Sequence, residues 1–295
     1  MANTKTYAGK TPFQLSMIRL GRNRVALICL GILIIYVLTA LVSFTNIGGL
    51  HDRATEFNLE NRFVPAFSTM DHPFGTDSFG RDVLARTIMG TRIALFLGFT
   101  TGLIMIPLAI VMGALSGYYG GWVDDIITYL MTVIYSIPGL LIIMSLVQVM
   151  GASFYVIAFA FGVTGWVGLA RVIRGAFIQA REYEYVLAAK NLGAGDMRII
   201  FRHIVPNVMH FVIVRFVLNF VGVIKAEVTL AYVGLSIIGV PSWGNMIDLS
   251  TSEIMAGNWQ NMIAPTLFMF LFLASLNIFG DALRDALDPK LKNVL

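Results

Sequence analysis

Residues 126–170 read IITYLMTVIYSIPGLLIIMSLVQVMGASFYVIAFAFGVTGWVGLA and contain no charged side chain. One transmembrane helix needs about 20 apolar residues, so this run is too long for a single span. The small residues Gly151-Ala152-Ser153 suit a turn, and we therefore predict two spans, at 126–150 and 153–170. Pro138 lies in the middle of the first span and predicts a kink there, either as a helix break that lines a pathway or as simple kinked packing.

The composition of the whole chain extends this pattern. Of 295 residues, 57% are hydrophobic and only 13% are charged, and the mean hydropathy is +0.77. A soluble domain needs a more polar surface than these residues supply. The apolar runs are long, which is typical of helices and not of the short alternating strands of a membrane barrel. We therefore predict an all-α integral membrane protein.

The net charge of +4 and the pI of about 9.2 do not indicate a nucleic-acid-binding protein. The basic residues are scattered at the ends of apolar runs, which is the pattern of cytoplasmic loops of membrane proteins, and they form no phosphate-binding face. Cys29 is the single cysteine, so the chain can form no internal disulfide and no cysteine-based metal site.

The chain divides into six transmembrane helices joined by polar segments. We predict a basic cytoplasmic tail at 1–24, a first span at 25–45, an extracytoplasmic loop at 46–92, a five-helix core at 93–290 and a cytoplasmic end at 291–295. The core spans are placed at about 93–116, 126–150, 153–170, 205–238 and 260–280, with 171–204 inside and 239–258 outside. The first apolar run is long enough to span and lacks a small-residue cleavage site, so we expect an anchor and not a signal peptide. The Lys and Arg residues of the inner segments put both termini in the cytoplasm.

Two finer features are predicted around the second span. Asp77 or Ser78 is the expected cap of a helix that begins near Phe79. Within the span, Pro107 predicts a kink. Glycines at four-residue spacing predict a helix face that another helix can approach closely, and they are Gly98, Gly102, Gly113, Gly117 and Gly121.

The inner segment 171–204 is the most polar stretch between two apolar runs. From Glu184 to Asn207 the sequence reads EYVLAAKNLGAGDMRIIFRHIVPN. We predict a helix from Arg171 to Leu192, a tight turn at Gly193–Gly195, and a second helix that starts at Asp196 as N-cap and runs to Pro206. Ala188 and Ala189 carry almost no side chain, so a partner surface could approach the backbone there.

The run Glu184-Tyr185-Val186-Leu187-Ala188-Ala189, followed by Gly193 and Val205-Pro206-Asn207, resembles the EAA loop of ABC importer permeases. Leu187 stands where that pattern has its glutamate, with Glu184 three residues earlier, as in peptide-importer permeases. Over roughly residues 70–290 the chain is similar to the second permease subunit of dipeptide and oligopeptide importers. Further elements of the resemblance are Gly75-Thr76-Asp77, Gly80-Arg81-Asp82, Gly117-Tyr118-Tyr119-Gly120-Gly121 followed by Val123-Asp124, Ser136-Ile137-Pro138, Trp243-Gly244-Asn245-Met246 and the run from Gly280 to Pro289.

The resemblance implies a subunit of an ATP-driven importer in a bacterial inner membrane. It implies a heterodimer with a related permease, one or two ATPase subunits, an extracytoplasmic solute-binding protein and surrounding lipid, and no nucleic acid. ATP and Mg would be bound by the ATPase subunits, while this chain would hold no cofactor, no metal and no catalytic residue. ATPase closure would reach the spans as a rigid-body rotation. The implied ATPase-coupling residues are Glu184, Ala188, Ala189, Gly193, Gly195 and Asp196.

Three charges lie inside the predicted fifth span, at Arg215, Lys225 and Glu227. Arg215 is about nine residues past Pro206, which is about 14 Å into the membrane at about 1.5 Å per residue. A charge at that depth needs a watery path or a partner. The candidates for a translocation path are therefore Arg215, Lys225, Glu227 and Pro138. Our hypothesis is that Arg215 attracts a substrate carboxylate, and pairing within the bundle or with the partner permease is an equal alternative.

A different cargo stays open at this point, and two other functions are disfavoured. The same architecture carries non-peptide cargo, such as a nickel chelate, an opine, a sugar or an antimicrobial peptide. A self-sufficient secondary transporter is disfavoured, because the chain has no internal repeat and one acid within a plausible span, Glu227. An enzyme is disfavoured as well, because the histidines lack HExxH spacing and Gly9-Lys10-Thr11 lacks the first glycine of a phosphate-binding loop.

Overall fold

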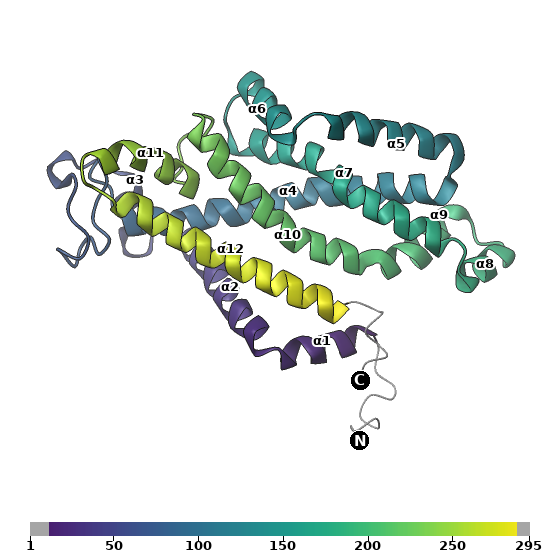
Figure 1. Ribbon diagram of the computed structural model, residues 1–295. Coiled ribbons are helices and arrows are strands. Elements are labelled where there is room, and N and C mark those ends of the chain that lie inside the picture. Colours follow the sequence, from purple (N-terminus) through teal and green to yellow (C-terminus); the bar gives the residue numbers. More distant parts are fainter. Residues whose placement is uncertain (1–11, 288–295) are drawn as a thin grey trace.

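The computed structural model describes residues 12–287, and that part of the chain folds almost entirely into helices (Figure 1). Residues 1–11 and 288–295 lie outside this description, and with them the start of the tail predicted at 1–24, the Gly9-Lys10-Thr11 stretch and the end predicted at 291–295. The helices are α1 Pro12–Arg22, α2 Arg24–Val42, α3 Leu50–Thr55, α4 Val83–Tyr119, α5 Gly121–Ser136, α6 Gly139–Met150, α7 Phe154–Ala180, α8 Glu184–Asn191, α9 Asp196–Arg198, α10 Val205–Tyr232, α11 Trp243–Met255 and α12 Gln260–Leu287, with a π-helical segment at Ile199–Ile204 and short 3-10 turns at Ile47–Gly49 and Leu59–Asn61.

Five helical stretches are long and apolar enough to cross a membrane, namely α2, α4, α7, the continuous stretch Asp196–Tyr232 and α12. The pair α5 and α6 meets the same standard only together, with a bend of 80° between the two helices. The predicted six spans are therefore found if the bent pair counts as one. The all-helical class is confirmed over the described residues, where the single strand-like pairing is the isolated bridge Thr76–Asp82.

The bend between α5 and α6 lies where the sequence predicts one. Ile137 has extended backbone angles (φ −96°, ψ 132°), which the residue before a proline prefers. Pro138 then occupies the N-cap position of α6, where its missing N–H is no loss, and its carbonyl accepts a hydrogen bond from the Leu141 N–H at 2.9 Å. Pro138 therefore breaks this span completely instead of kinking a continuous helix.

The other helix ends differ from the predicted span ends. The helix that contains the second span begins at Val83, close to the start predicted near Phe79 and well before the predicted span, and α7 continues past the predicted span end at 170 to Ala180. The helix of the fifth span stops at Tyr232 instead of 238, and the outer segment predicted at 239–258 contains α11. The predicted spans mark the apolar runs, whereas the helices extend beyond them through charged residues such as Arg86 and Arg174.

The N-terminus of α4 is the clearest of these corrections. Asp82, and not Asp77 or Ser78, is the N-cap, and its side chain accepts a hydrogen bond from the Ala85 N–H at 2.8 Å. Asp77 does not cap the helix. Its carboxylate forms an ion pair with Arg81 at 2.8 Å and lies 3.6 Å from the buried Arg86. Further along, α4 runs unbroken through Pro107.

Glycines let α4 pack closely against two different helices at two levels. A Cβ on Gly98 would clash with Phe220 of α10, and one on Gly113 would lie 2.6 Å from the Ala170 carbonyl oxygen of α7. Gly102 and Gly117 repeat these contacts one turn further on, against Phe216 and the Arg174 carbonyl. The predicted small-residue face is thus confirmed for these four glycines. Gly121 is not on that face, because it starts α5 with φ +52°.

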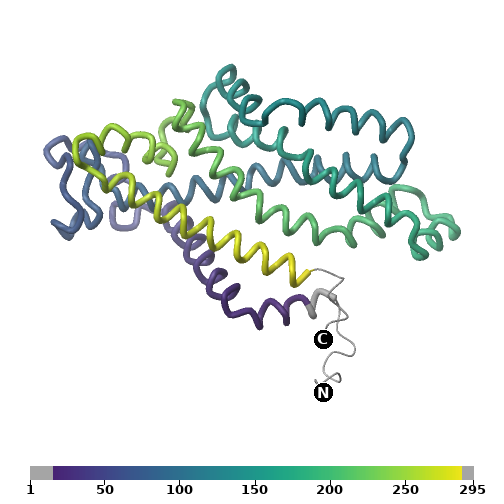
Figure 2. Tube along the Cα trace, viewed as in Figure 1, coloured from purple at the N-terminus to yellow at the C-terminus, as the bar shows by residue number. Residues whose placement is uncertain are grey.

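The two ends of the bundle differ in character. At one end, α3 and the chain up to residue 82 pack with α11 against the start of α4 (Figure 1). At the opposite end, α8 and α9 project beyond α7 and α10. Between the ends, α2 runs beside α12, as the trace in Figure 2 shows, and the Tyr36 hydroxyl of α2 donates to the Phe268 carbonyl of α12 at 2.8 Å.

Candidate functional site: a projecting loop and a basic trough

The predicted loop projects from the end of the bundle that lies away from α3. It is shorter than predicted, because the chain leaves α7 only after Ala180 and enters α9 at Asp196. Within it, α8 is a separate two-turn helix that begins at Glu184. The single helix predicted from Arg171 to Leu192 is thus two helices, with a break at residues 181–183.

Gly193 ends α8 in the left-handed conformation that the sequence predicts. Its φ is +79°, and its N–H donates to the Lys190 carbonyl at 3.0 Å. The next N–H, of Ala194, donates to the Ala189 carbonyl at 3.0 Å. This pair of bonds is a Schellman cap, which requires a residue that tolerates positive φ. A Cβ on Gly193 would meet nothing within 4 Å, so the glycine is needed here for its backbone conformation and not for packing within this chain.

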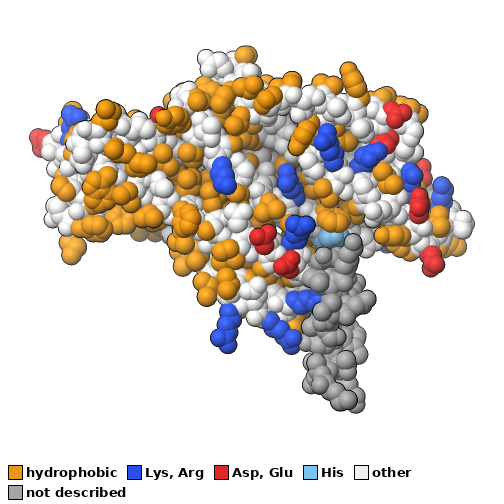
Figure 3. Space-filling model, in the orientation of Figure 1, with side chains coloured by type: hydrophobic (Ala, Val, Ile, Leu, Met, Phe, Trp, Pro, Cys, Tyr) orange, Lys and Arg blue, Asp and Glu red, His pale blue; other side chains and the backbone are white. Residues whose placement is uncertain are grey.

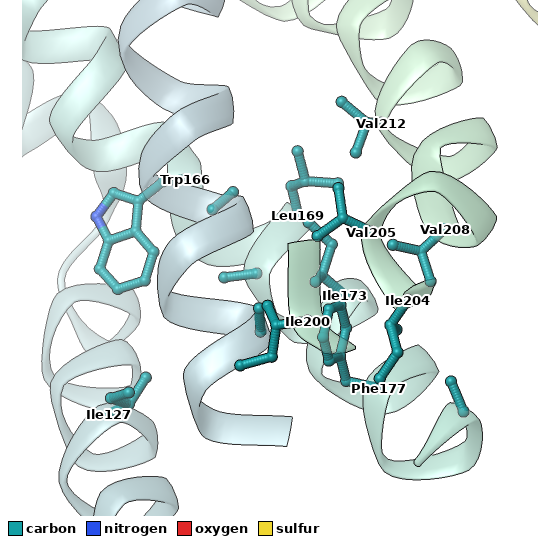
Figure 4. Packing of buried hydrophobic residues seen from close by; sticks show 14 of the residues in the cluster. Ile127, Trp166, Leu169, Ile173, Phe177, Ile200, Ile204, Val205, Val208 and Val212 are labelled. Atoms are coloured by element: carbon teal, nitrogen blue, oxygen red, sulfur yellow. The ribbon is translucent and has the colours of Figure 1, made fainter. Parts of the chain in front are cut away.

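Val186 anchors α8 to the rest of the molecule. Its side chain is 2% exposed and belongs to the apolar cluster that contains Phe177 of α7 and Ile200 and Ile204 of the π-helical segment. Figure 4 shows Ile173, Phe177 and Ile204 lying together in this cluster. Loop and spans therefore share one core.

The two alanines before the turn have different surroundings. Ala189 is half-buried and packs against the same apolar cluster, whereas Ala188 is exposed. Glu184 is also exposed, in the first turn of α8. Leu187 and Leu192 present apolar surface outward, and Leu192 is 89% exposed. Together with the small Ala188, these leucines give α8 an apolar outward surface.

The second helix of the loop differs from its prediction at both ends. Gly195 holds the N-cap position without a side-chain bond, and Asp196 is the first helical residue. The Asp196 carboxylate instead accepts a hydrogen bond from the Tyr118 hydroxyl of α4 at 2.8 Å. The helix does not end at Pro206 but continues to Tyr232. The π-helical segment just before Pro206 explains this continuity, because a widened turn accommodates a residue that lacks an N–H and crowds the preceding turn.

A charged clamp ties the corner between α4 and α5 to α7. Arg174 of α7 forms two hydrogen bonds to the Asp124 carboxylate, both at 2.6 Å. The same carboxylate accepts hydrogen bonds from the Ser116 and Thr128 hydroxyls. Since two-point Arg–carboxylate pairs fix orientation as well as distance, this corner and α7 are held as one body.

Three cavities follow one another along α7 and α10, from the α5–α6 bend to the projecting loop. The first, of about 610 Å³, is lined by Pro138 and Arg215 among others. The second, of about 440 Å³, shares Arg215 with the first and adds Arg284. The third, of about 650 Å³, shares His210 with the second and is lined by Arg171 and by Tyr183 of the loop. We call this succession the basic trough, and Figure 3 shows Lys and Arg side chains spread over the middle of the face that carries α10 and α12.

Of the four path candidates, two line the basic trough and two do not. Pro138 and Arg215 line the same cavity. Lys225 is exposed on α10 but does not line the trough. Glu227 is 5% exposed at the other end of α10, where its carboxylate accepts a hydrogen bond from the Ser242 hydroxyl at 2.7 Å. Glu227 therefore joins α10 to the start of α11 and lies away from the trough.

Sequence reasoning missed several residues of these sites. Tyr118 and Asp124 lie in motifs that carried the resemblance, so their importance had a signal, but their partners had none because they are far away in the chain. Arg171, His210 and Arg284 showed no pattern in the sequence that would place them on one trough. Among residues 12–287, no group of three His, Cys, Asp or Glu side chains could hold a metal ion.

Comparison with known proteins gives a consistent result. Residues 105–293 match the family described as binding-protein-dependent transport system inner membrane component. The chain is 38% identical over 276 residues to the dipeptide transport system permease protein DppC of Bacillus subtilis, covering 93% of this chain and 84% of that protein. It is 35% identical over 281 residues to the oligopeptide transport system permease protein OppC of the same organism, covering 94% and 89%.

Among solved structures, the fold resembles an inward-facing form of the MetNI methionine ABC transporter, with a TM-score of 0.54. The match covers 69% of this chain and 96% of that chain. The sequence identity is 14%, so this likeness concerns the fold alone.

Proposed function

The chain belongs to the family of binding-protein-dependent ABC importer permeases, and from this premise we propose that it is the permease subunit that docks an ATPase through α8 and forms half of a path for dipeptides or oligopeptides. The protein is a multi-pass membrane protein. We propose further that it pairs with a related permease in a bacterial inner membrane, with both termini and α8 in the cytoplasm. ATP and Mg are then bound by one or two ATPase subunits, and a solute-binding protein delivers the cargo at the end that carries α3 and α11.

The observation that carries the docking role is the exposed, capped and anchored α8. Its outward side offers Ala188, where a partner can approach the backbone, beside the apolar Leu187 and Leu192. Glu184 stands at the edge of this surface, where it can pair with a basic residue of the ATPase. Gly193 fixes the direction in which the chain leaves the helix. The surface is small and preorganised, which lowers the entropy cost of binding.

Three connections would carry a displacement of α8 into the spans. Val186 joins it to the cluster between α7 and the π-helical segment, which continues into α10. The hydrogen bond from Tyr118 to Asp196 joins the loop to α4. The Arg174–Asp124 clamp joins α7 to α5, which flanks the trough. Closure of the ATPase subunits then turns these helices together, and the trough alternates between the two sides of the membrane.

The peptide cargo is proposed from the names of the relatives, which are dipeptide and oligopeptide transport permeases. A non-peptide cargo, such as a nickel chelate, an opine, a sugar or an antimicrobial peptide, is the alternative with the same architecture. Uptake of labelled peptides by the reconstituted complex, compared with uptake of those other solutes, decides between them.

The docking role is tested by replacing Ala188 with tryptophan. We expect the permease to insert and to retain its partner permease, because Ala188 is exposed and makes no internal contact that the larger ring would break. ATPase recovered with the tagged permease should fall at least about tenfold, since a single well-placed clash exceeds the about 1.4 kcal/mol that a tenfold loss requires. The matched control is Ala256→Trp, the same change at an exposed alanine just after α11, at the opposite end. Full ATPase recovery with Ala188→Trp would show that the docking surface lies elsewhere.

A further inference from the structure

The basic trough has a lining of one charge sign. Arginines from three helices reach it, Arg171 from α7, Arg215 from α10 and Arg284 from α12, together with His210. No Asp or Glu of the described residues lines any of its three cavities. Asp281 and Asp285 are exposed on α12 near Arg284, but they are not part of the lining. A lining that holds three guanidinium groups and no carboxylate favours an anionic group on the molecule that passes through it.

Arg215 is exposed within this chain, and of the trough's arginines it is the one that lines the cavity at the α5–α6 bend. It faces both the cavity at the α5–α6 bend and the next cavity along α10. Its side chain forms no hydrogen bond or ion pair with any residue between 12 and 287. Gly168 of α7 makes room for the guanidinium, because a Cβ there would lie 3.1 Å from Nη2 of Arg215. An arginine at membrane depth without a partner is costly unless a ligand or another chain pairs with it.

The remaining basic residues continue the same surface towards the projecting loop. His210 lies on α10 between Arg215 and the loop, and its Nδ1 is 2.9 Å from the Asn207 carbonyl oxygen. That bond places a proton on Nδ1, so Nε2 of the neutral ring is an acceptor, and the donors offered to an anion here are those of Arg284 and Arg171. Arg171 lies over the ring of Tyr135 with 4.5 Å from Cζ to the ring centroid, so its guanidinium is held in place at the last cavity.

We propose that the basic trough selects cargo with a free carboxylate, which Arg215 binds at membrane depth and which Arg284 and Arg171 then attract towards the cytoplasmic end. This inference rests on the proposed importer function and adds the chemical class of the cargo. Guanidinium groups suit the role because they bind a carboxylate through two parallel N–H bonds. The apolar walls, with Ile137 and Leu140 at the bend, can contact varied cargo side chains without distinguishing among them. A peptide with a free C-terminus fits this description, whereas a neutral sugar or a strongly cationic peptide does not.

The test uses the whole importer, reconstituted in liposomes with its partner permease, ATPases and binding protein. The probes are trialanine and trialanine amide, which differ only in the C-terminal charge. Each is supplied on binding protein that is saturated with it, so that the preference of the binding protein does not enter the measured rate. We expect the wild-type complex to transport trialanine at least about ten times faster per complex than the amide.

The variant Arg215→Gln removes the charge and keeps hydrogen-bonding capacity. Transport of trialanine should fall about tenfold and transport of the amide should stay within about twofold, so that the preference disappears. Arg215→Lys should restore part of the preference for trialanine. It keeps the positive charge but replaces the guanidinium, which can form two parallel hydrogen bonds, with a single ammonium group. Lys225→Gln is the matched control, since it removes an exposed cation from the same helix outside the trough and should leave the preference intact.

Four results would overturn the inference. Equal wild-type rates for the two probes would mean that the trough does not distinguish a carboxylate from an amide. An equal slowing of both probes by Arg215→Gln would mean the same. Loss of the partner permease on purification of Arg215→Gln would mean that Arg215 pairs with a protein group. If the wild-type complex imports neither tripeptide, the proposed peptide cargo fails together with this inference, whereas import of both at one rate removes only the role of the trough.

Discussion

The two ends of the bundle differ in the burial and pairing of their carboxylates. At the end with α3 and α11, carboxylates are buried and satisfied inside the chain: Asp77 is 0% exposed beside Arg81 and Arg86, and Glu253 accepts a hydrogen bond from the Ser78 N–H at 2.8 Å. At the end with α8, Glu184 is exposed and the apolar Leu192 faces outward. The first end thus satisfies its buried carboxylates within the chain, and the second presents the surface that we propose an ATPase covers.

This difference predicts which substitutions change the stability of the permease and which change its coupling to the ATPase. A buried carboxylate that holds a buried arginine cannot be removed without leaving a charge unpaired in the interior. An exposed surface residue away from such features usually changes stability by less than about 0.5 kcal/mol. We therefore expect substitutions at the α3 end to act through folding, and substitutions at the α8 end to act through coupling to the ATPase.

The largest effect is expected for Asp77→Ala at the self-contained end. It leaves Arg86, which is 3% exposed, without its nearest carboxylate, and also removes the acceptor of the Phe79 and Arg81 N–H groups. We expect a loss of about 3–5 kcal/mol in the free energy of unfolding. Thermal unfolding of the purified permease in detergent measures it. Asp77→Asn, which keeps an acceptor oxygen, should lose less, and Glu184→Ala at the other end should lose almost nothing. Equal stability of all three variants would contradict the contrast between the ends.

An intermediate effect is expected for Gly193→Ala at the projecting end. An L-residue at φ +79° costs about 1–2 kcal/mol, and the strain is confined to the cap of α8. We expect the permease to remain folded while peptide uptake per ATP hydrolysed falls severalfold, because the docking helix loses its fixed exit. Gly31→Ala, in the exposed middle of α2 where a Cβ meets nothing within 4 Å, is the matched control and should be neutral or slightly stabilising. Normal coupling in Gly193→Ala would mean that the cap conformation is not needed for docking.

The smallest effect is expected for Tyr118→Phe. The change removes the hydrogen bond to Asp196 and keeps the ring, so the loss of stability should be at most about 1 kcal/mol. We expect about a twofold drop in uptake per ATP hydrolysed, because one of the connections between loop and spans is weakened. Tyr119→Phe, the neighbouring tyrosine without that bond, is the control. An equal response of the two variants would assign no coupling role to the Tyr118 bond.

Much of the fold follows from local sequence. The uncharged run 126–170 predicts two apolar crossings, and Pro138 and Gly151 divide it where the structure does. Gly193 is predicted and found as a left-handed cap. These features depend on hydropathy and on the backbone preferences of single residues, which act over a few positions in the chain. The helix N-caps were predicted less well, because Asp77 pairs with Arg81 and lies near Arg86, and Asp82 caps α4 in its place.

The candidate site divides in the same way. The sequence by itself determined the membrane helices, the bend at Pro138 and a two-helix loop that ends α8 at Gly193. Only the tertiary structure decided that Asp196 accepts a hydrogen bond from Tyr118 instead of capping its own helix, that Arg174 holds Asp124, and that Arg171, Arg215 and Arg284 share one trough without an acid. The physical reason is that a side chain takes the best partner within reach, and which groups come within reach depends on how the helices pack.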